Sequence, residues 1–294
     1  MATLRELKSR IGSVSSTEKT TSAMKMISSA KMRKATTQLQ QLTPYRGMVQ
    51  QVLGHLLMTD HEFDSPLTTE REVKHIDLVI FGSDDGLCGA YNINLFKQLL
   101  TVVNDLRKGK QPLDITIIPV GKKLTRAALK LKIEGVDVLS DHGLDTRSNS
   151  EVLNAFTEML RNRFVSGTTD RVDVLYMRFI STSRQRFTRE QLLPVSPAAL
   201  SQEADRKAAN RPCLFEPDAN TLFNSVLPLH IRATIANVYT QNSASEQSAR
   251  VMAMQTASDN AKELLDDLKL EYNKLRQQSI TTELLDILGG QVER

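Results

Sequence analysis

The sequence predicts an α/β protein built as a long antiparallel coiled coil of its N- and C-terminal helices, with an α/β domain inserted between them. Three observations support this fold class. Apolar residues recur at heptad spacing near the start of the chain and again near its end, and buried-strand runs alternate with helical segments in the middle. At 294 residues the chain is long enough for more than one structural unit.

The first helix is predicted over residues 3–58, so that residues 1–58 form an N-terminal shaft helix. Leu4, Leu7, Ile11 and Val14 have the 3-4-3 spacing of a coiled-coil seam. The seam turns polar over residues 15–22 and then resumes. Pro44 is expected to kink the helix or to mark a boundary. A helix of this length would reach roughly 80 Å, too long for one compact domain.

The C-terminal third mirrors this pattern, and residues 218–294 are predicted as a C-terminal shaft helix. A second seam with 4-3 spacing runs along Ile231, Ile235, Val238, Asn242, Ser245, Ala249, Met252 and Thr256. We expect Pro228 to separate a short helix from the long one, and Gly289 and Gly290 to end the long one. The two shaft helices are expected to pair antiparallel through their seams.

The middle of the chain, residues 75–195, is predicted as a Rossmann-like domain with a parallel sheet. Strands are expected at 76–82, 114–120, 136–139 and 172–181, with helices at 92–107, 121–132 and 148–165 and a hairpin strand at 186–194. Strands that alternate with helices imply parallel βαβ crossovers. Residues 196–217 contain three prolines and mixed charges, and are predicted to be a linker.

Composition excludes several classes of protein. No run of 18 apolar residues is present, the N-terminus lacks a secretory signal, and two cysteines 125 positions apart are interpreted as reduced thiols. The net charge is +4, but the first 46 residues contain nine Lys and Arg and only two Glu, a net charge of +7. Such a basic arm could meet nucleic acid, anionic lipid or an acidic protein surface.

No catalytic, metal or cofactor site is predicted. The turn at residues 83–92 follows a strand, where α/β proteins often bind ligands, but Gly86 and Gly89 give only G-x-x-G. A structural turn is therefore favoured over nucleotide binding, and also over a divalent-ion site at Asp84 and Asp85. Cys88 is interpreted as a packing thiol rather than a nucleophile. The histidines have no metal-ligand spacing.

Long motifs at both ends resemble one known family. They are residues 8–11 and 23–35, then 244–254, 257–261 and 272–284, with 86–89 and 92–96 in the middle. These segments resemble the gamma subunit of F-type ATP synthases. The resemblance implies a rotor with no active site and no cofactor, whose terminal helices thread a ring of alternating alpha and beta subunits. Its α/β domain, with the epsilon subunit, would form a foot on the membrane ring of c subunits, so that proton flow drives ATP synthesis in the beta subunits.

The resemblance also assigns residues. Met24 and Lys25 match positions that face the hinge region of the beta subunits, and Arg250 matches an arginine on the opposing helix in that zone. Arg276, Gln277 and Thr281 match the group that meets the beta catch loops, and Glu216 lies where the foot approaches the c ring. The sequence departs from the family at Asp85, Pro228 and Cys213. A bacterial complex is implied, with this subunit peripheral on the cytoplasmic side of the cell membrane.

Two other classes stay open at this point. A receiver-like α/β enzyme with helical arms would need a phosphate or metal site. A basic coiled-coil protein that binds nucleic acid would explain the +7 arm, but base-stacking aromatic residues are absent from that arm. Co-purification with alpha and beta subunits, with nucleic acid, or with neither would separate the three.

Overall fold

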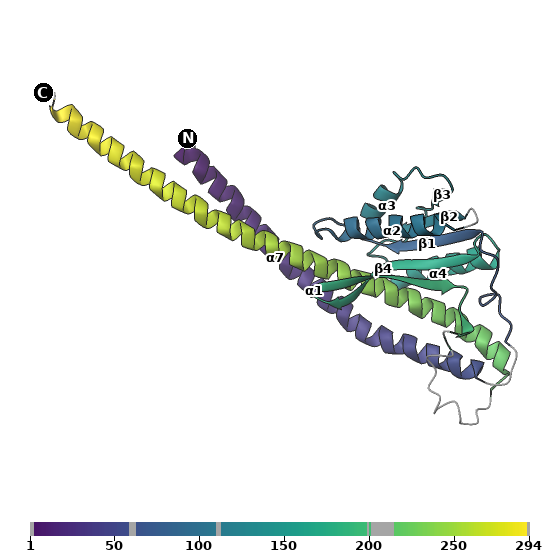
Figure 1. Cartoon of the computed structure of the whole chain (residues 1–294). Helices are drawn as coiled ribbons and strands as arrows, with labels where there is room; N and C mark the ends of the chain where they lie inside the picture. The colour runs from purple at the N-terminus through teal and green to yellow at the C-terminus, as the bar shows by residue number, and fades with distance from the viewer. Residues whose placement is uncertain (1–2, 59–62, 110–112, 199, 201–214, 293–294) are drawn as a thin grey trace.

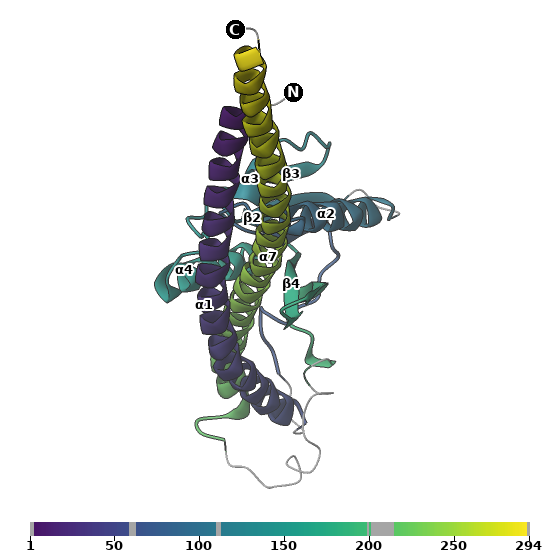
Figure 2. The ribbon, with the colours of Figure 1, turned by 90° about the vertical axis from the view of Figure 1, so that its left-hand side faces the viewer.

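A computed structural model describes residues 3–58, 63–109, 113–198, 200 and 215–292, with side chains described as far as residue 285. It confirms the predicted fold class. Two long helices from opposite ends of the chain lie side by side, and an α/β domain sits against one half of the pair (Figures 1 and 2). The N-terminal part of α1 and the C-terminal part of α7 project away from that domain.

Helix α1 spans Leu4–Leu57 and begins with a capping box. The Thr3 hydroxyl accepts a hydrogen bond from the Glu6 amide, and the Glu6 carboxylate accepts one from the Thr3 amide. Pro44 lies inside the helix and does not end it. Figure 2 shows α1 bending toward its C-terminal end, the part that contains Pro44.

Helix α7 spans Ala219–Val292 without interruption, which corrects two expectations. Pro228 does not separate two helices, because Phe223 and Leu227 before it and Ile231 after it are all buried in the same core. That burial offsets the roughly 3 kcal/mol that an interior proline costs. The helix also continues through Gly289 and Gly290. Asp218 caps its start by accepting hydrogen bonds from the Thr221 amide and hydroxyl.

The α/β domain contains a five-stranded sheet in the order β3-β2-β1-β4-β5. The strands are β1 (His75–Phe81), β2 (Asp114–Val120), β3 (Val136–Val138), β4 (Arg171–Ser181) and β5 (Arg184–Leu193), and the helices are α2 (Tyr91–Arg107), α3 (Lys122–Ala128) and α4 (Ser150–Val165). The first four strands are parallel, and β5 pairs antiparallel with β4. The predicted hairpin strand is thus confirmed.

Three layers result from the alternation of side chains along the central strand. Ile76, Leu78 and Ile80 of β1 pack with α2 and α3 on one face of the sheet. Val79 and Phe81 pack on the other face with α4, α7 and the end of α1. On that second face buried Asp77 accepts hydrogen bonds from Nε and Nη2 of an α4 arginine, Arg163, at 2.8 and 3.0 Å.

The first residues of the predicted C-terminal seam lie in a core shared by α1, α7 and the sheet, but from Asn242 onward the seam contacts the α/β domain. Asn242 donates a hydrogen bond to the Gly82 carbonyl and Ser245 donates one to the Met177 carbonyl. Ala249 packs against the hydrophobic core between the sheet and α2. Helix α1 meets a different stripe of α7, which includes Asn237, Ala244, Gln255 and Ser258. The expected antiparallel pair therefore exists, but α7 uses one face for each neighbour.

Candidate functional site

A set of buried hydrogen bonds joins α7 to the α/β domain. We call it the junction: Asn242, Ser245, Ser248 and Arg250 of α7 with their hydrogen-bond partners. Each of the four is at most 8% exposed. Asn242 donates to the Gly82 carbonyl at 2.8 Å and accepts from the Tyr91 hydroxyl at 2.6 Å. A buried amide is thus satisfied across two elements at once.

The two serines hold the β4–β5 hairpin. Ser245 donates to the Met177 carbonyl at 2.7 Å, and Ser248 donates to the Thr182 carbonyl at 2.8 Å. Gln185 of β5 donates to the Ser248 hydroxyl at 2.6 Å. These small polar residues, which would weaken an isolated coiled coil, are used here to bind backbone carbonyls of the hairpin.

Arg250 joins α7 to the turn after β1. Its guanidinium donates to the carbonyls of Gly86 and Asp85 at 3.2 and 3.3 Å, and to the Glu246 carboxylate at 2.8 Å. Burial raises the pKa of Glu246, and Arg250 opposes that shift. The charges of this buried pair are compensated by each other and by backbone carbonyls.

The turn after β1 is held by its own carboxylates. Asp84 accepts hydrogen bonds from the amides of Lys122 and Thr146, at 2.9 and 3.1 Å, and from the Thr146 hydroxyl. Asp85 forms an ion pair with Arg147. The turn is therefore tied to the start of α3 and to the loop before α4, in agreement with its interpretation as a structural turn.

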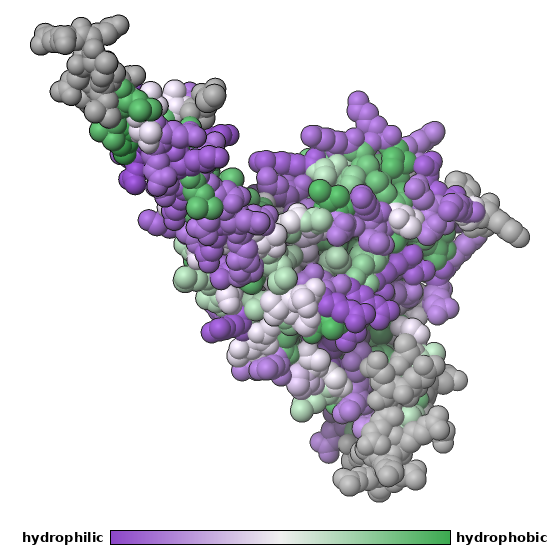
Figure 3. Space-filling view, turned by 60° about the vertical axis from the view of Figure 1, so that its left-hand side comes forward, coloured by the Kyte–Doolittle hydropathy of each residue, from purple (hydrophilic) through white to green (hydrophobic). Residues whose placement is uncertain are grey.

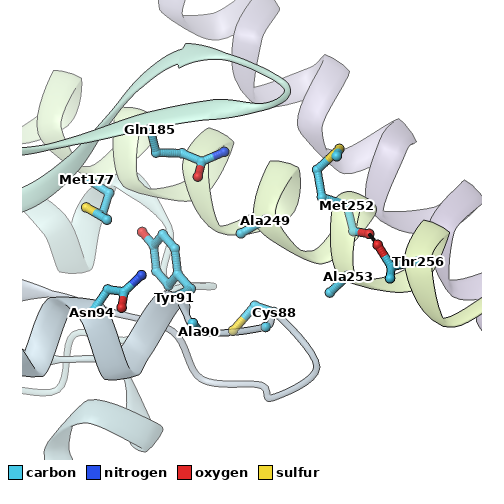
Figure 4. Close-up of a pocket in the computed structure, with 11 residues that line it drawn as sticks. Cys88, Ala90, Tyr91, Asn94, Met177, Gln185, Ala249, Met252, Ala253 and Thr256 are labelled. Carbon is cyan, nitrogen blue, oxygen red and sulfur yellow. Dashed lines mark hydrogen bonds between the residues drawn. The ribbon is translucent and has the colours of Figure 1, made fainter.

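A pocket of about 270 Å³ lies beside the junction (Figure 4). Its side chains come from the start of α2, from the β4–β5 hairpin and from α7, with Tyr91, Met177 and Met252 as the large ones. Cys88 at its base is a free, buried thiol whose pKa is raised by burial. A raised thiol pKa disfavours the nucleophilic thiolate, which agrees with a packing role.

The shaft residues assigned from sequence lie on the paired helices. Met24 is exposed, and the Lys25 ammonium donates to the Gln255 side chain of α7 at 2.9 Å. Arg276, Gln277 and Thr281 are exposed on α7, far along the chain from the junction. The last turns of α7 extend beyond the start of α1 (Figure 1).

Glu216 is exposed immediately before α7, at the opposite end of that helix from Arg276 and Gln277. The structure does not bring the seven assigned residues together. Of the seven, Arg250 alone belongs to the junction, and its guanidinium is hydrogen-bonded to other groups of this chain. Cys213 and most of the predicted linker lie outside the described residues.

Sequence reasoning missed Tyr91, Gly82 and the hairpin as partners of α7. The signal was present in the polar residues Asn242 and Ser245 at seam positions, where a coiled coil prefers apolar side chains. In the part of the chain that the structure describes, no group of three His, Cys, Asp or Glu side chains could hold a metal ion. No helix of that part could cross a membrane.

The family model that matches residues 3–292 is described as ATP synthase. The ATP synthase gamma chain of Phocaeicola vulgatus is 41% identical over 292 residues, covering 99% of each chain. The chain belongs to the ATP synthase gamma chain family. The gamma chain of Cupriavidus pinatubonensis is 36% identical over 292 residues, again covering 99% of each.

Solved structures agree in fold. A chain of the Euglena gracilis mitochondrial ATP synthase matches with a TM-score of 0.64 at 20% identity, covering 98% of this chain and 93% of that one. A chain from the central stalk and c-ring structure of the Tetrahymena thermophila mitochondrial ATP synthase matches with a TM-score of 0.58 at 22% identity, covering 81% and 99%.

Proposed function

We propose that this chain is the central-stalk rotor of a proton-transporting ATP synthase, coupling rotation of the membrane c ring to ATP synthesis in the beta subunits without an active site of its own. The observation that carries the proposal is the junction. A rotor must pass torque from a foot to a shaft, and here buried hydrogen bonds from three elements of the α/β domain converge on one continuous helix. Membership in the gamma chain family supports the same role.

The shaft end is proposed to contact the catalytic ring of alpha and beta subunits. Met24 and Lys25 would face the hinge region of the beta subunits, and Arg276, Gln277 and Thr281 would meet their catch loops. The exposure of Met24 and of the three α7 residues supports this part of the proposal. The guanidinium of Arg250 is already engaged, so we expect it to shape the surface that meets the beta subunits and not to bind them directly.

The foot end is proposed to bind the epsilon subunit and the c ring, with Glu216 at the c-ring contact. In this arrangement the subunit is peripheral, on the cytoplasmic side of a bacterial cell membrane. Glu216 is exposed and lies three residues before the start of α7, and this supports a contact there. A force applied at Glu216 would be passed directly to the long helix.

The experiment compares Glu216→Lys with Glu134→Lys, the same charge reversal at another exposed glutamate, on the α/β domain. In membranes that carry Glu216→Lys, we expect ATP-driven proton uptake to fall while ATP hydrolysis by the detached soluble assembly survives. Glu134→Lys should leave both unchanged. Normal proton uptake with Glu216→Lys would remove this residue from the c-ring contact.

Two further measurements separate the rotor from the other classes. Affinity-tagged chain should co-purify with alpha and beta subunits in fixed stoichiometry, and with no nucleic acid. Calorimetry of the full-length chain should detect no ATP binding at micromolar concentrations, because the sequence lacks a phosphate-binding loop. Micromolar ATP binding would favour the enzyme reading instead.

A further inference from the structure

A second surface lies on the outer face of the α/β domain. A hollow of about 460 Å³ lies beside α3 and is lined by Phe96, Lys123, Arg126, Ala127, Lys130 and Leu131. The α2 and α3 helices cover the face of the sheet opposite to α4 and the long helices. Figure 3 shows hydrophobic surface bordered by hydrophilic side chains at the level of these two helices.

The cations of this surface have no salt-bridge partner in the described part of the chain. Residues 122–133 contain five Lys and Arg and no Asp or Glu. Among the residues that the structure describes, Lys123, Arg126 and Lys130 form no salt bridge, whereas Arg147 and Arg163 of the same domain each have a carboxylate partner. The segment therefore has a net positive charge, and Glu134 is the first carboxylate to follow it.

The three cations form a row and not a single cluster. Their spacing of three and four residues places them on one helix face. The helical turn continues past the end of α3, since Leu129 donates to the Thr125 carbonyl at 2.9 Å and Lys130 to that of Ala127 at 3.2 Å. The row is roughly 10 Å long at the rise of a helix. Phe96, Ala127 and Leu131 form an apolar floor beside it.

We propose that this surface binds an acidic protein segment that presents one bulky apolar side chain between carboxylates. A row of cations matches successive carboxylates along a peptide, and the recessed floor accepts an apolar side chain. A membrane surface would instead require several apolar groups that protrude together. Leu129 is exposed beside the row, but Phe96 and Leu131, which line the hollow, are partly buried. This surface lies across the sheet from α4 and the long helices, apart from the shaft contacts proposed for the alpha and beta subunits.

The test uses the full-length chain and a fluorescein-labelled peptide in which one leucine lies between runs of glutamate. Arg126→Gln/Lys130→Gln removes two cations of the row. Arg186→Gln/Lys262→Gln removes the same charge from exposed sites on β5 and α7, and is the matched control. Binding is measured by fluorescence anisotropy at low and at physiological salt, with circular dichroism to verify the fold of each variant.

We expect the first variant to weaken binding about fivefold or more relative to the control, since two exposed ion pairs are lost. A peptide with serine in place of leucine should also bind more weakly. Equal binding by both variants would overturn the proposal. Vesicles of phosphatidylserine and phosphatidylcholine serve as a second probe: if they bind the chain through Arg126 and Lys130 while the peptide does not, the surface recognises lipid and the proposed partner is wrong.

Discussion

Substituting Asn242 by alanine should weaken the attachment of α7 to the α/β domain. The Gly82 carbonyl would lose its side-chain donor at 2.8 Å, and the Tyr91 hydroxyl would lose its 2.6 Å acceptor. Tyr91 would keep only the Asn242 backbone carbonyl, at 3.3 Å. Leaving a buried polar group without a partner costs about 1–3 kcal/mol, so we expect Asn242→Ala to lower the free energy of unfolding by about 2–3 kcal/mol.

Urea unfolding of the full-length chain measures that loss, and Asn260→Ala is the control. Asn260 is an exposed asparagine of the same helix, so its replacement should change stability by less than about 0.5 kcal/mol. In the assembled enzyme, Asn242→Ala should reduce ATP-driven proton uptake more than ATP hydrolysis. If the two alanine variants unfold at the same urea concentration, the junction does not stabilise the contact between α7 and the α/β domain.

Three other predictions concern stability alone. Burial lowers the pKa of His230 to about 4, so the folded chain takes up this proton only at lower pH than the unfolded chain, whose value is about 6.5. Stability should therefore fall by about 3 kcal/mol as the pH drops from about 6.5 to about 4, and His230→Gln should flatten that dependence in urea titrations. Asp77→Ala leaves Arg163 without its carboxylate partner and should lower the free energy of unfolding by about 3 kcal/mol. Asp105→Ala removes only an exposed ion pair with Lys108 and should lower it by less than about 0.5 kcal/mol in the same assay. Gly121→Ala should lower stability by at least about 2 kcal/mol, because φ at Gly121 is +109° and a Cβ would lie 2.9 Å from backbone atoms. Gly47 lies inside a helix and a Cβ there would meet no atom within 4 Å, so Gly47→Ala should raise stability by about 0.5–1 kcal/mol. Thermal unfolding measures both changes.

Periodicity was sufficient to predict the strands of the α/β domain and the first long helix. The second strand occupies the predicted residues 114–120, and the first helix lies within one residue of its expected limits. These segments have a strong local signal, because a buried strand is continuously apolar and an exposed helix has a heptad stripe. Pro228 was misjudged because its effect depends on how tightly the residues around it pack, which only the tertiary structure determines.

The partner of each helix face was the least predictable feature. A 4-3 stripe indicates that something apolar covers it, but does not distinguish a second helix from a sheet. The polar side chains of Asn242 and Ser245 are unfavourable in the seam of a two-helix coiled coil, so they could have indicated a hydrogen-bonding partner other than a helix. The assigned contact residues depend on subunits outside this chain, so neither periodicity nor the structure of the chain alone tests them.

The pairing of the first helix with the last one has a consequence for biosynthesis. Lys25 meets Gln255, and Glu18 meets Ser258, across more than two hundred intervening residues. During translation the α/β domain leaves the ribosome before α7 exists, and domains generally fold as units in that order. Helix α1 is therefore synthesised first, but the helix that it pairs with is synthesised last. Until α7 emerges, its apolar stripe is free to pair with any other helix, and the newly made chain is most vulnerable to aggregation during that interval.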